Sequence, residues 1–319
     1  QDAQADFAKY FPIDHTSIAR GGVRNTNLHQ DARFAKAIVS TNTAGGDFGP
    51  GQIQNALDHV NDLGGGILYL KDGTYLPPAT LIGYSNILMV GESLSGVIID
   101  FSNTTISNGT GMQFFGTNVA GAGTITLTNG SSTVSGSGTF FNANGVTSGD
   151  VIYVNYSKYT VSTVTNNTTL TISETYNGNT ASGFQYGIFR NPLSNFGLIN
   201  MTFQDTPAST KLVHLNVVEN FLLDNVSFKN SIGYGLYMEN FFLPYVNNLR
   251  ASNNLGGFYI DGGDVETPAF INGLVANDSV GAGFLINNVR GISMSNLFSS
   301  GNSDQGMDIS GAINSTFTG

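Results

Sequence analysis

The sequence predicts an all-β protein, and more closely a parallel β-helix with coils of about 22 to 26 residues. Its 41 glycines and its many Asn, Ser and Thr residues are typical of short strands joined by tight turns. Two short patterns repeat with one common period through residues 196–319. Within each repeat apolar and polar residues alternate, as in a strand that buries one of its faces.

Composition and charge exclude several classes of protein. The 319-residue chain has a formal net charge of −10 and only 12 Lys and Arg residues, so it lacks the clustered cations that neutralise phosphates. It has no cysteine and no run of 18 apolar residues that would form a transmembrane helix. We therefore expect no nucleic-acid partner, no membrane insertion, and a largely neutral polar surface of a kind that suits sugars.

The N-terminal segment differs in charge from the remainder of the chain. Five of the 12 basic residues lie within the first 36 positions, together with four aspartates. We assign residues 1–47 to an N-terminal arm. One interpretation is that the arm becomes ordered against a partner protein, and the alternative is a flexible terminus.

Residues 48–118 are expected to form a capping helix and the first coils. Apolar residues recur at helical spacing just before a run of three glycines, at Ile53, Ala56, Leu57, Val60 and Leu63. Asp-Gly, Pro-Pro and Gly turns then separate four short predicted strands, at residues 67–70, 74–76, 86–90 and 97–101.

Residues 119–187 interrupt the repeats. Polar and apolar residues alternate here over several predicted strands, and no pattern repeats with the period of the coils. We predict a small antiparallel β-barrel or sandwich inserted between early coils, acting as a spacer or docking module.

The coils resume at residues 188–319, where four segments align without gaps. They begin at Gly235, Gly257, Gly283 and Gly306, and read "GLYMEN", "GFYIDG", "GFLINN" and "GMDISG". Alternation assigns eight side chains to the core, namely Leu236, Met238, Phe258, Ile260, Phe284, Ile286, Met307 and Ile309. Because the last recognisable coil has no cap, we expect further coils or a covering partner beyond residue 319.

Residues 53–100 carry a resemblance to a known family. The stretch from "IQNALDHVNDLGGGILYLKDGTYL" to "GESLSGVIID" resembles the start of the pectin-lyase-like right-handed parallel β-helix proteins. The inserted stretch, with "GSSTVSGSGTFF" and "GVTSGDVIYV", is similar to a small β-module of bacteriophage tail proteins. Together they suggest a phage tailspike or tail fibre. The catalytic motifs of the family's polygalacturonases and pectate lyases are absent, so the resemblance assigns no catalytic position.

The same alignment places the outward side chains in two rows. One row is His214, Tyr237, Tyr259, Leu285 and Asp308, and the other is Asn216, Glu239, Asp261, Asn287 and Ser310. Adjacent coils lie about 4.8 Å apart, so Glu239 and Asp261 would approach the roughly 5 Å separation of a retaining glycosidase pair. Two carboxylates that close raise each other's proton affinity, which would let one serve as the acid.

Three interpretations of these rows remain open. In the first, Glu239 and Asp261, with Asp308, are catalytic. In the second, the rows bind a glycan, with Tyr237 and Tyr259 offering ring faces to sugars; the further binding residues are His214, Asn216 and Asn287. In the third, they are an ordinary solvated surface, which any β-helix needs for solubility.

A cation loop is a separate hypothesis. Asp264 and Glu266 lie on the longest corner segment, close to Asp261, and the three could supply oxygen ligands to Ca²⁺. Their spacing is not that of an EF-hand loop, and further ligands would be needed. Apart from this Ca²⁺ we expect no cofactor.

These observations predict a tailspike-like virion adhesin that binds host cell-surface polysaccharide. The resemblance implies a homotrimer, located in the virion tail or otherwise extracellular, whose N-terminal arm docks to another virion protein. One alternative is a polysaccharide-degrading hydrolase or lyase on the same scaffold. Another is a purely structural virion or cell-surface protein.

Overall fold

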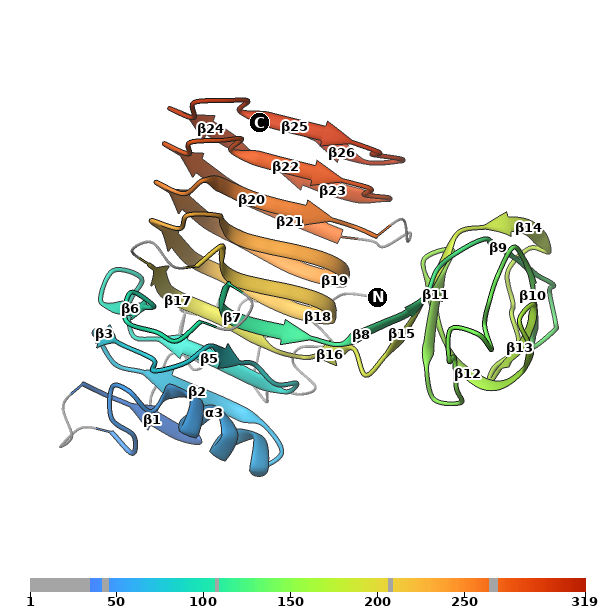
Figure 1. The fold of residues 1–319 in the computed structure, drawn as a ribbon, viewed down its shortest axis with the longest axis horizontal. Helices are drawn as coiled ribbons and strands as arrows, with labels where there is room; N and C mark the ends of the chain where they lie inside the picture. The colour runs from blue at the N-terminus through green and yellow to red at the C-terminus, as the bar shows by residue number, and fades with distance from the viewer. Residues whose placement is uncertain (1–34, 42–45, 107–108, 206–208, 264–268) are drawn as a thin grey trace, which may run out of the picture.

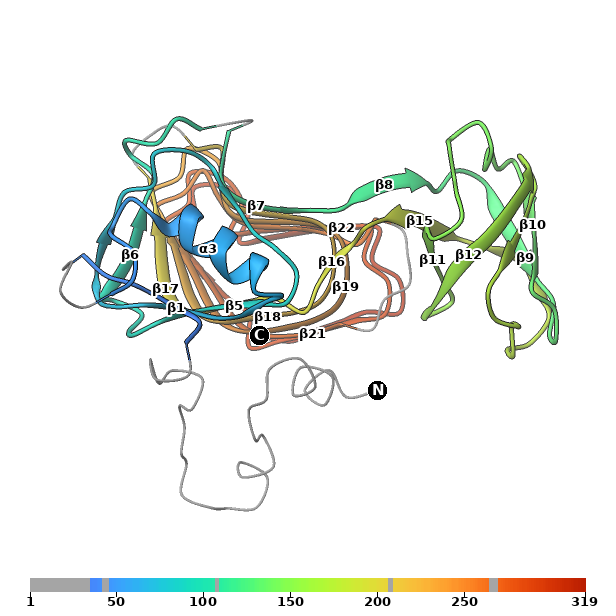
Figure 2. The same cartoon turned by 90° about the horizontal axis from the view of Figure 1, so that it is seen from below.

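The computed structural model describes residues 35–41, 46–106, 109–205, 209–263 and 269–319. In this part the chain is a parallel β-helix with a short helix at one end and a separate antiparallel sheet beside it (Figure 1). The expected fold class is therefore confirmed. Figure 2 shows that the coils enclose one core from three sides.

Each side is a stack of parallel strands. The first face comprises β1 (Ala37–Val39), β2 (Gly66–Leu70), β5 (Ile87–Gly91), the first parts of β17 (Gly197–Gln204) and β21 (Ala269–Asn277), the middle of β18 (Lys211–Lys229) and β19 (Tyr234–Ser252), β23 (Ile292–Ser295) and β26 (Thr316–Phe317). The second face comprises β3 (Gly73–Tyr75), β6 (Val97–Asp100), the last parts of β17, β18, β19 and β21, and β24 (Phe298–Ser300).

The third face is the one that carries the predicted rows. It comprises β4 (Leu81–Ile82), β7 (Thr110–Phe115), the first parts of β18 and β19, β20 (Gly256–Asp261), β22 (Phe284–Asn287) and β25 (Met307–Ser310). At the corner between the third and first faces, β16 (Leu193–Ser194) pairs with β18. Every one of these pairings is parallel, so each coil lies in register on the one before it.

The helix α3 (Ile53–Asp62) covers the N-terminal end of the core, as the sequence predicts. Its inward side chains Ile53, Ala56, Leu57 and Val60 are buried, whereas Leu63, which follows the last turn, is exposed. Gly65 has φ of +101°, and a Cβ there would lie 2.3 Å from a backbone oxygen, so only glycine fits this turn. No helix among the described residues is long and apolar enough to cross a membrane.

The alternation of the coils holds for most of the predicted core. Leu236, Met238, Phe258, Ile260, Phe284 and Ile286 are all buried, with no more than 1% of the surface exposed. The last pair keeps the inward register, since Met307 pairs with Phe284 and Ile309 with Ile286, but Met307 is half-buried and Ile309 is 39% exposed. Both belong to β25, the last layer of the third face, and no further described coil covers them.

Asparagines form a ladder at the corner between the first and second faces. Asn200, Asn225, Asn248 and Asn296 have φ of 52° to 55°, and Gly273 takes the corresponding place with φ of 70°. The Asn225 amide donates to Oδ1 of Asn200 at 2.8 Å, which joins adjacent coils. Asparagine suits this corner because it tolerates the left-handed conformation and can bond to the next coil.

An antiparallel module occupies the segment between β7 and β16. Its eight strands are β8 (Thr117–Ala120), β9 (Thr124–Leu127), β10 (Thr133–Ser137), β11 (Val151–Val154), β12 (Ser157–Asn166), β13 (Thr169–Ile172), β14 (Ala181–Phe184) and β15 (Tyr186–Arg190). They enclose a hydrophobic cluster of their own. The chain leaves the third face after β7 and returns at the corner that precedes the next strand of the first face.

The antiparallel module rests on the corner between the third and first faces. Tyr153 stacks on Phe242 of the coil with ring centroids 3.6 Å apart, and Phe189 meets the same ring edge-on. Lys158 Nζ lies 2.6 Å from Glu219 Oε1, and the Tyr153 hydroxyl donates to the other oxygen of Glu219. An aromatic contact and a charged hydrogen bond therefore fix the module to the coils.

The predicted N-terminal arm lies mostly outside the described residues. Its described part includes β1, which pairs in parallel with β2 through Ala37 to Leu68 and Val39 to Leu70. Residues 37–39 thus extend the first face by one layer.

The asparagine ladder leads to a first prediction. Asn225→Ala should lower the free energy of unfolding by about 2 kcal/mol, because alanine is strained in the left-handed region and the inter-coil hydrogen bond is lost. Asn225→Gly loses only the bond, so its cost should be about half as large. Urea unfolding followed by circular dichroism measures both. An alanine variant as stable as the glycine variant would contradict this account of the corner.

Candidate functional site

The outward side chains of the third face form two rows in the register predicted from the sequence. The first row runs through Gln113, His214, Tyr237, Tyr259, Leu285 and Asp308, and the second through Phe115, Asn216, Glu239, Asp261, Asn287 and Ser310. Gln113 and Phe115, on β7, were not predicted. The alternation of "GMQFF" is the sequence signal that could have added them.

His214 is the most enclosed polar residue of these rows. It is 6% exposed, and its Nε2 lies 2.8 Å from Glu239 Oε1 on the next coil. Its ring meets Phe115 at 4.6 Å and Tyr237 at 4.9 Å, both in edge-to-face geometry. Neighbours from three consecutive coils therefore hold the imidazole in one orientation.

Lys211 completes a short polar chain across this site. Its Nζ lies 3.5 Å from His214 Nδ1 and 4.1 Å from the centre of the Tyr237 ring. An ammonium group only donates, so Nδ1 accepts and the proton of a neutral imidazole lies on Nε2, from which it is donated to Glu239. Lys211, His214 and Glu239 thus form a cation, a neutral bridge and an anion.

Burial controls the protonation of this chain. It lowers the pKa of His214, and the charge of Lys211 lowers it further, while Glu239 opposes both through its hydrogen bond and its charge. Burial also lowers the pKa of Lys211, again opposed by Glu239. His214 is therefore neutral at neutral pH.

Three tyrosines form the centre of the third face. The rings of Tyr237 and Tyr259 are parallel within 2° with centroids 4.0 Å apart, and Tyr234 meets both edge-on. Tyr259 covers one face of Tyr237, whose ring also interacts with Lys211, so the expectation of free ring faces for sugars is wrong for Tyr237. Burial raises the pKa of Tyr237, so its hydroxyl stays protonated.

Asp261 lies beside Glu239 in the second row. Its Oδ2 accepts a hydrogen bond from the Tyr259 hydroxyl at 3.2 Å, and its Oδ1 accepts one from the Gly263 backbone at 2.9 Å. The backbone register pairs it directly with Glu239 on the preceding coil. The two carboxylates are therefore neighbours, but each has different hydrogen-bond partners.

The predicted cation loop is described only in part. Asp264 and Glu266 lie outside the described residues, so Asp261 is the one proposed ligand that can be placed. Within the described ranges no three His, Cys, Asp or Glu residues gather closely enough to hold a metal ion.

The remaining predicted residues lie in the rows outside the polar chain, although Asn216 pairs in register with Glu239. Oδ1 of Asn216 accepts from the Asn240 amide at 3.0 Å, as part of an inter-coil ladder. Asn287 lies between Asp261 and Ser310 in the register. Asp308 is separated from Tyr259 by Leu285, so the fold does not bring it to Glu239.

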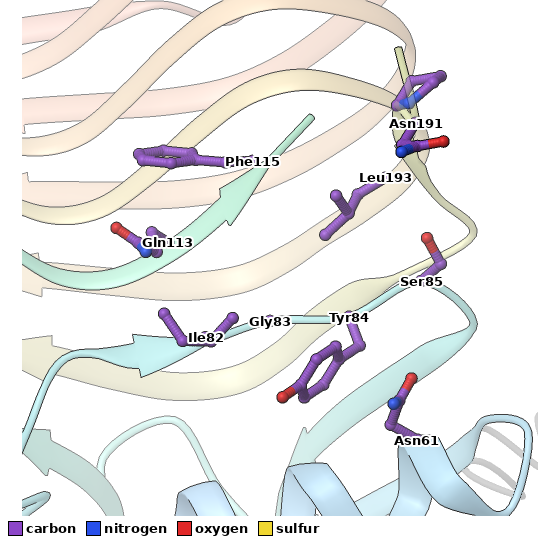
Figure 3. A pocket seen from close by; sticks show the side chains of 10 residues that line it. Asn61, Ile82, Gly83, Tyr84, Ser85, Gln113, Phe115, Asn191 and Leu193 are labelled. Carbon is purple, nitrogen blue, oxygen red and sulfur yellow. The ribbon is translucent and has the colours of Figure 1, made fainter. Parts of the chain in front are cut away.

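A pocket of about 600 Å³ opens where the third face meets the returning chain (Figure 3). It lies between β4, β7, the end of α3 and the corner at β16, and its lining residues are Asn61, Ile82, Gly83, Tyr84, Ser85, Gln113, Phe115, Asn191, Pro192 and Leu193. No charged residue is among them. Sequence reasoning missed this pocket because residues 191–193 approach β7 only after the whole antiparallel module.

Comparison with solved structures finds phage tailspikes and polysaccharide-modifying enzymes. The tailspike gp61 of Pseudomonas phage phi297 has 13% identity and a TM-score of 0.41, covering 76% of this chain and 51% of its own. The Gp54 tailspike of Acinetobacter baumannii phage AP22, solved with a capsular saccharide, has 15% identity and a TM-score of 0.37, covering 86% and 57%.

An enzyme is also among these structures. The A-module of the Azotobacter vinelandii mannuronan C-5 epimerase AlgE4 has 12% identity and a TM-score of 0.39, covering 84% of this chain and 72% of its own. The chain spans about half the length of the two tailspikes, 51% and 57%. No protein-family profile matches the sequence, and no curated protein sequence matches it either.

The polar chain leads to a second prediction, on pH. The imidazole of His214 should titrate below the ordinary value of about 6.5, because burial disfavours its charged form. Glu239→Gln should lower this pKa further, and Lys211→Met should raise it. NMR titration of the His214 ring proton, assigned with His214→Gln, measures all three.

The lowered pKa of His214 also makes the free energy of unfolding depend on pH. Because the folded pKa is depressed, the unfolded chain binds this proton more readily, and stability should decline as pH falls through about 6.5. His214→Gln should remove that part of the decline. A His214 signal that titrates above 6.5 in the native protein would contradict the assignment of a neutral, desolvated imidazole.

Proposed function

We propose that the third face of the β-helix binds a polysaccharide. The observation that carries this proposal is the unbroken outward series of hydrogen-bonding and aromatic side chains from Gln113 through His214 and Tyr237 to Asp261. These groups lie on successive coils, and from His214 to Asp261 they contact one another. A preorganised polar surface of this kind loses little side-chain entropy when a ligand binds.

The regular spacing of the coils favours a polymer over a small ligand. Each layer adds its outward groups about 4.8 Å after the last, so an extended chain running along the stack meets new partners at every step. Tyrosine hydroxyls donate, carboxylates accept, and Lys211 donates, which matches the hydroxyl groups of sugars. The net charge of the chain, −10, makes nucleic acid a poor alternative.

The biological form we propose is a tailspike-like adhesin. It follows the sequence resemblance described above, and it implies a ligand on the bacterial surface, a homotrimeric assembly and a place in the virion tail. In this proposal the N-terminal arm attaches the protein to another virion component. The third face then provides the contact with the host.

Glycan retention is the third prediction. On a panel of purified bacterial capsular and O-antigen polysaccharides, at least one should retain the wild-type protein in affinity electrophoresis. Lys211→Ala should weaken retention at least tenfold, because it removes a hydrogen-bonding group and leaves the His214 Nδ1 of the polar chain unpaired. Arg250→Ala, an exposed cation on the second face, is the matched control and should bind normally.

Two outcomes would contradict the proposal. The first is that no polysaccharide retains the wild-type protein. The second is that the Arg250 variant loses as much binding as the Lys211 variant, which would indicate a general effect of charge.

Cleavage of the bound polysaccharide is the second candidate function. The observation that favours it is the cluster of Lys211, His214 and Glu239, because burial keeps His214 neutral, as a general base must be, and lowers the pKa of Lys211 from its ordinary value. Glu239 with Asp261 provides the adjacent carboxylates that a hydrolase would use. Both groups of residues line the surface on which the glycan would lie.

Turnover is the fourth prediction. If the face is catalytic, the wild-type protein should release reducing ends from a retained polysaccharide, or raise its ultraviolet absorbance through unsaturated sugars. Glu239→Gln and Asp261→Asn should each lower the rate at least 100-fold while the glycan is still bound. Unchanged rates in both variants would exclude the two carboxylates, and binding without turnover in the wild type would leave the adhesin as the function.

A further inference from the structure

We propose that the pocket between β4, β7 and the β16 corner binds a single uncharged sugar residue at the end of the glycan site. This inference rests on the proposed function, since the pocket shares Gln113 and Phe115 with the third face. A volume of about 600 Å³ is within the range of small-ligand sites. The ligand class is an uncharged pyranose, either a plain hexose or an N-acetylhexosamine.

The polar groups that line the pocket are neutral. Asn61, Ser85, Gln113 and Asn191 contribute amides and a hydroxyl, from α3, the β4–β5 turn, β7 and the returning corner (Figure 3). These groups both donate and accept, as sugar hydroxyls and acetamido groups do. They come from four separate parts of the fold, so the pocket exists only in the assembled β-helix.

Gln113 supplies an acceptor that lacks a partner. Its Oε1 is buried, and no described residue donates a hydrogen bond to it. A buried oxygen left unpaired costs free energy, and a ligand that donates an O–H or N–H to it would recover that cost. A ligand with a hydrogen-bond donor would satisfy this oxygen once the Gln113 amide turns toward the pocket.

The pocket also has an apolar lining. Ile82 and Phe115, which lie on either side of Gln113, are 37% and 38% exposed, and Leu193 lies on the returning corner (Figure 3). Exposed apolar side chains next to convergent amides suit a pyranose, which has C–H groups on its faces and hydroxyls at its rim. Phe115 also contacts the His214 ring, which connects the pocket to the polar chain.

The same lining argues against an acidic sugar. It contains no Lys, Arg or His to balance a carboxylate. Behind it, the Tyr84 hydroxyl donates to Asp58 Oδ1 at 2.7 Å, so the nearest charge that this lining contacts is negative. Burying a second carboxylate without a partner is costly. A uronate should therefore be rejected.

The test is saturation-transfer NMR on the full chain with five methyl glycosides. The probes are those of glucose, galactose, N-acetylglucosamine, N-acetylgalactosamine and glucuronate. We expect transfer to at least one uncharged glycoside and at least fivefold less to the glucuronide. Gln113→Leu should reduce the transfer at least fivefold without lowering the melting temperature, because it removes an oxygen that has no partner within the protein. Gln305→Leu, an exposed glutamine near the last coil, is the matched control.

Three outcomes would contradict the proposal that this pocket binds an uncharged sugar. They are no transfer to any uncharged glycoside, equal transfer to the glucuronide, and unchanged transfer in Gln113→Leu. The polysaccharide panel separates this failure from that of the proposed function. If the wild type binds a polysaccharide and Lys211→Ala does not, while the pocket fails its test, the third face binds the glycan without this terminal site. If no polysaccharide binds, the proposed function fails instead.

Discussion

The structure depends on the parallel hydrogen bonding that sets each coil directly on the one before. This register decides which side chains of distant segments become neighbours, because a position in one coil always meets the same position in the next. Phe258 stacks on Phe284 in the core and Tyr237 stacks on Tyr259 outside for this one reason. A shift of one residue would exchange the inward and outward side chains of a strand, and the polar rows would then face the core.

The same constraint explains how a surface row can become partly buried. Outward side chains on adjacent coils are close enough to cover one another, so a histidine between Phe115 and Tyr237 loses most of its contact with water. The hydrogen bonds of His214 must then come from residues of the same coil or of the next one, and Lys211 and Glu239 supply them. Any binding or proton transfer on this face therefore depends on the coil register as much as on the residues themselves.

The antiparallel module adds the feature that regular coils cannot provide. Coils alone give straight faces, whereas the return of the chain at Asn191 to Leu193 places an extra wall beside β7. The contacts of Tyr153 and Lys158 with the coil hold the module against this corner. The insertion thus creates a pocket at one end of a surface that is otherwise a repeating ladder.

The sequence alone determined the repeat, because a fixed period and strict alternation leave only one arrangement of inward and outward residues. The repeat predicted the neighbouring positions of Glu239 and Asp261 in one row, and helical spacing before three glycines predicted the capping helix. The sequence could not identify Lys211 as a partner of His214, since the two lie three residues apart on one strand, where strict alternation would place them on opposite faces. The pocket at Gln113 was likewise decided by tertiary structure, because its walls come from segments that only the closed fold brings together.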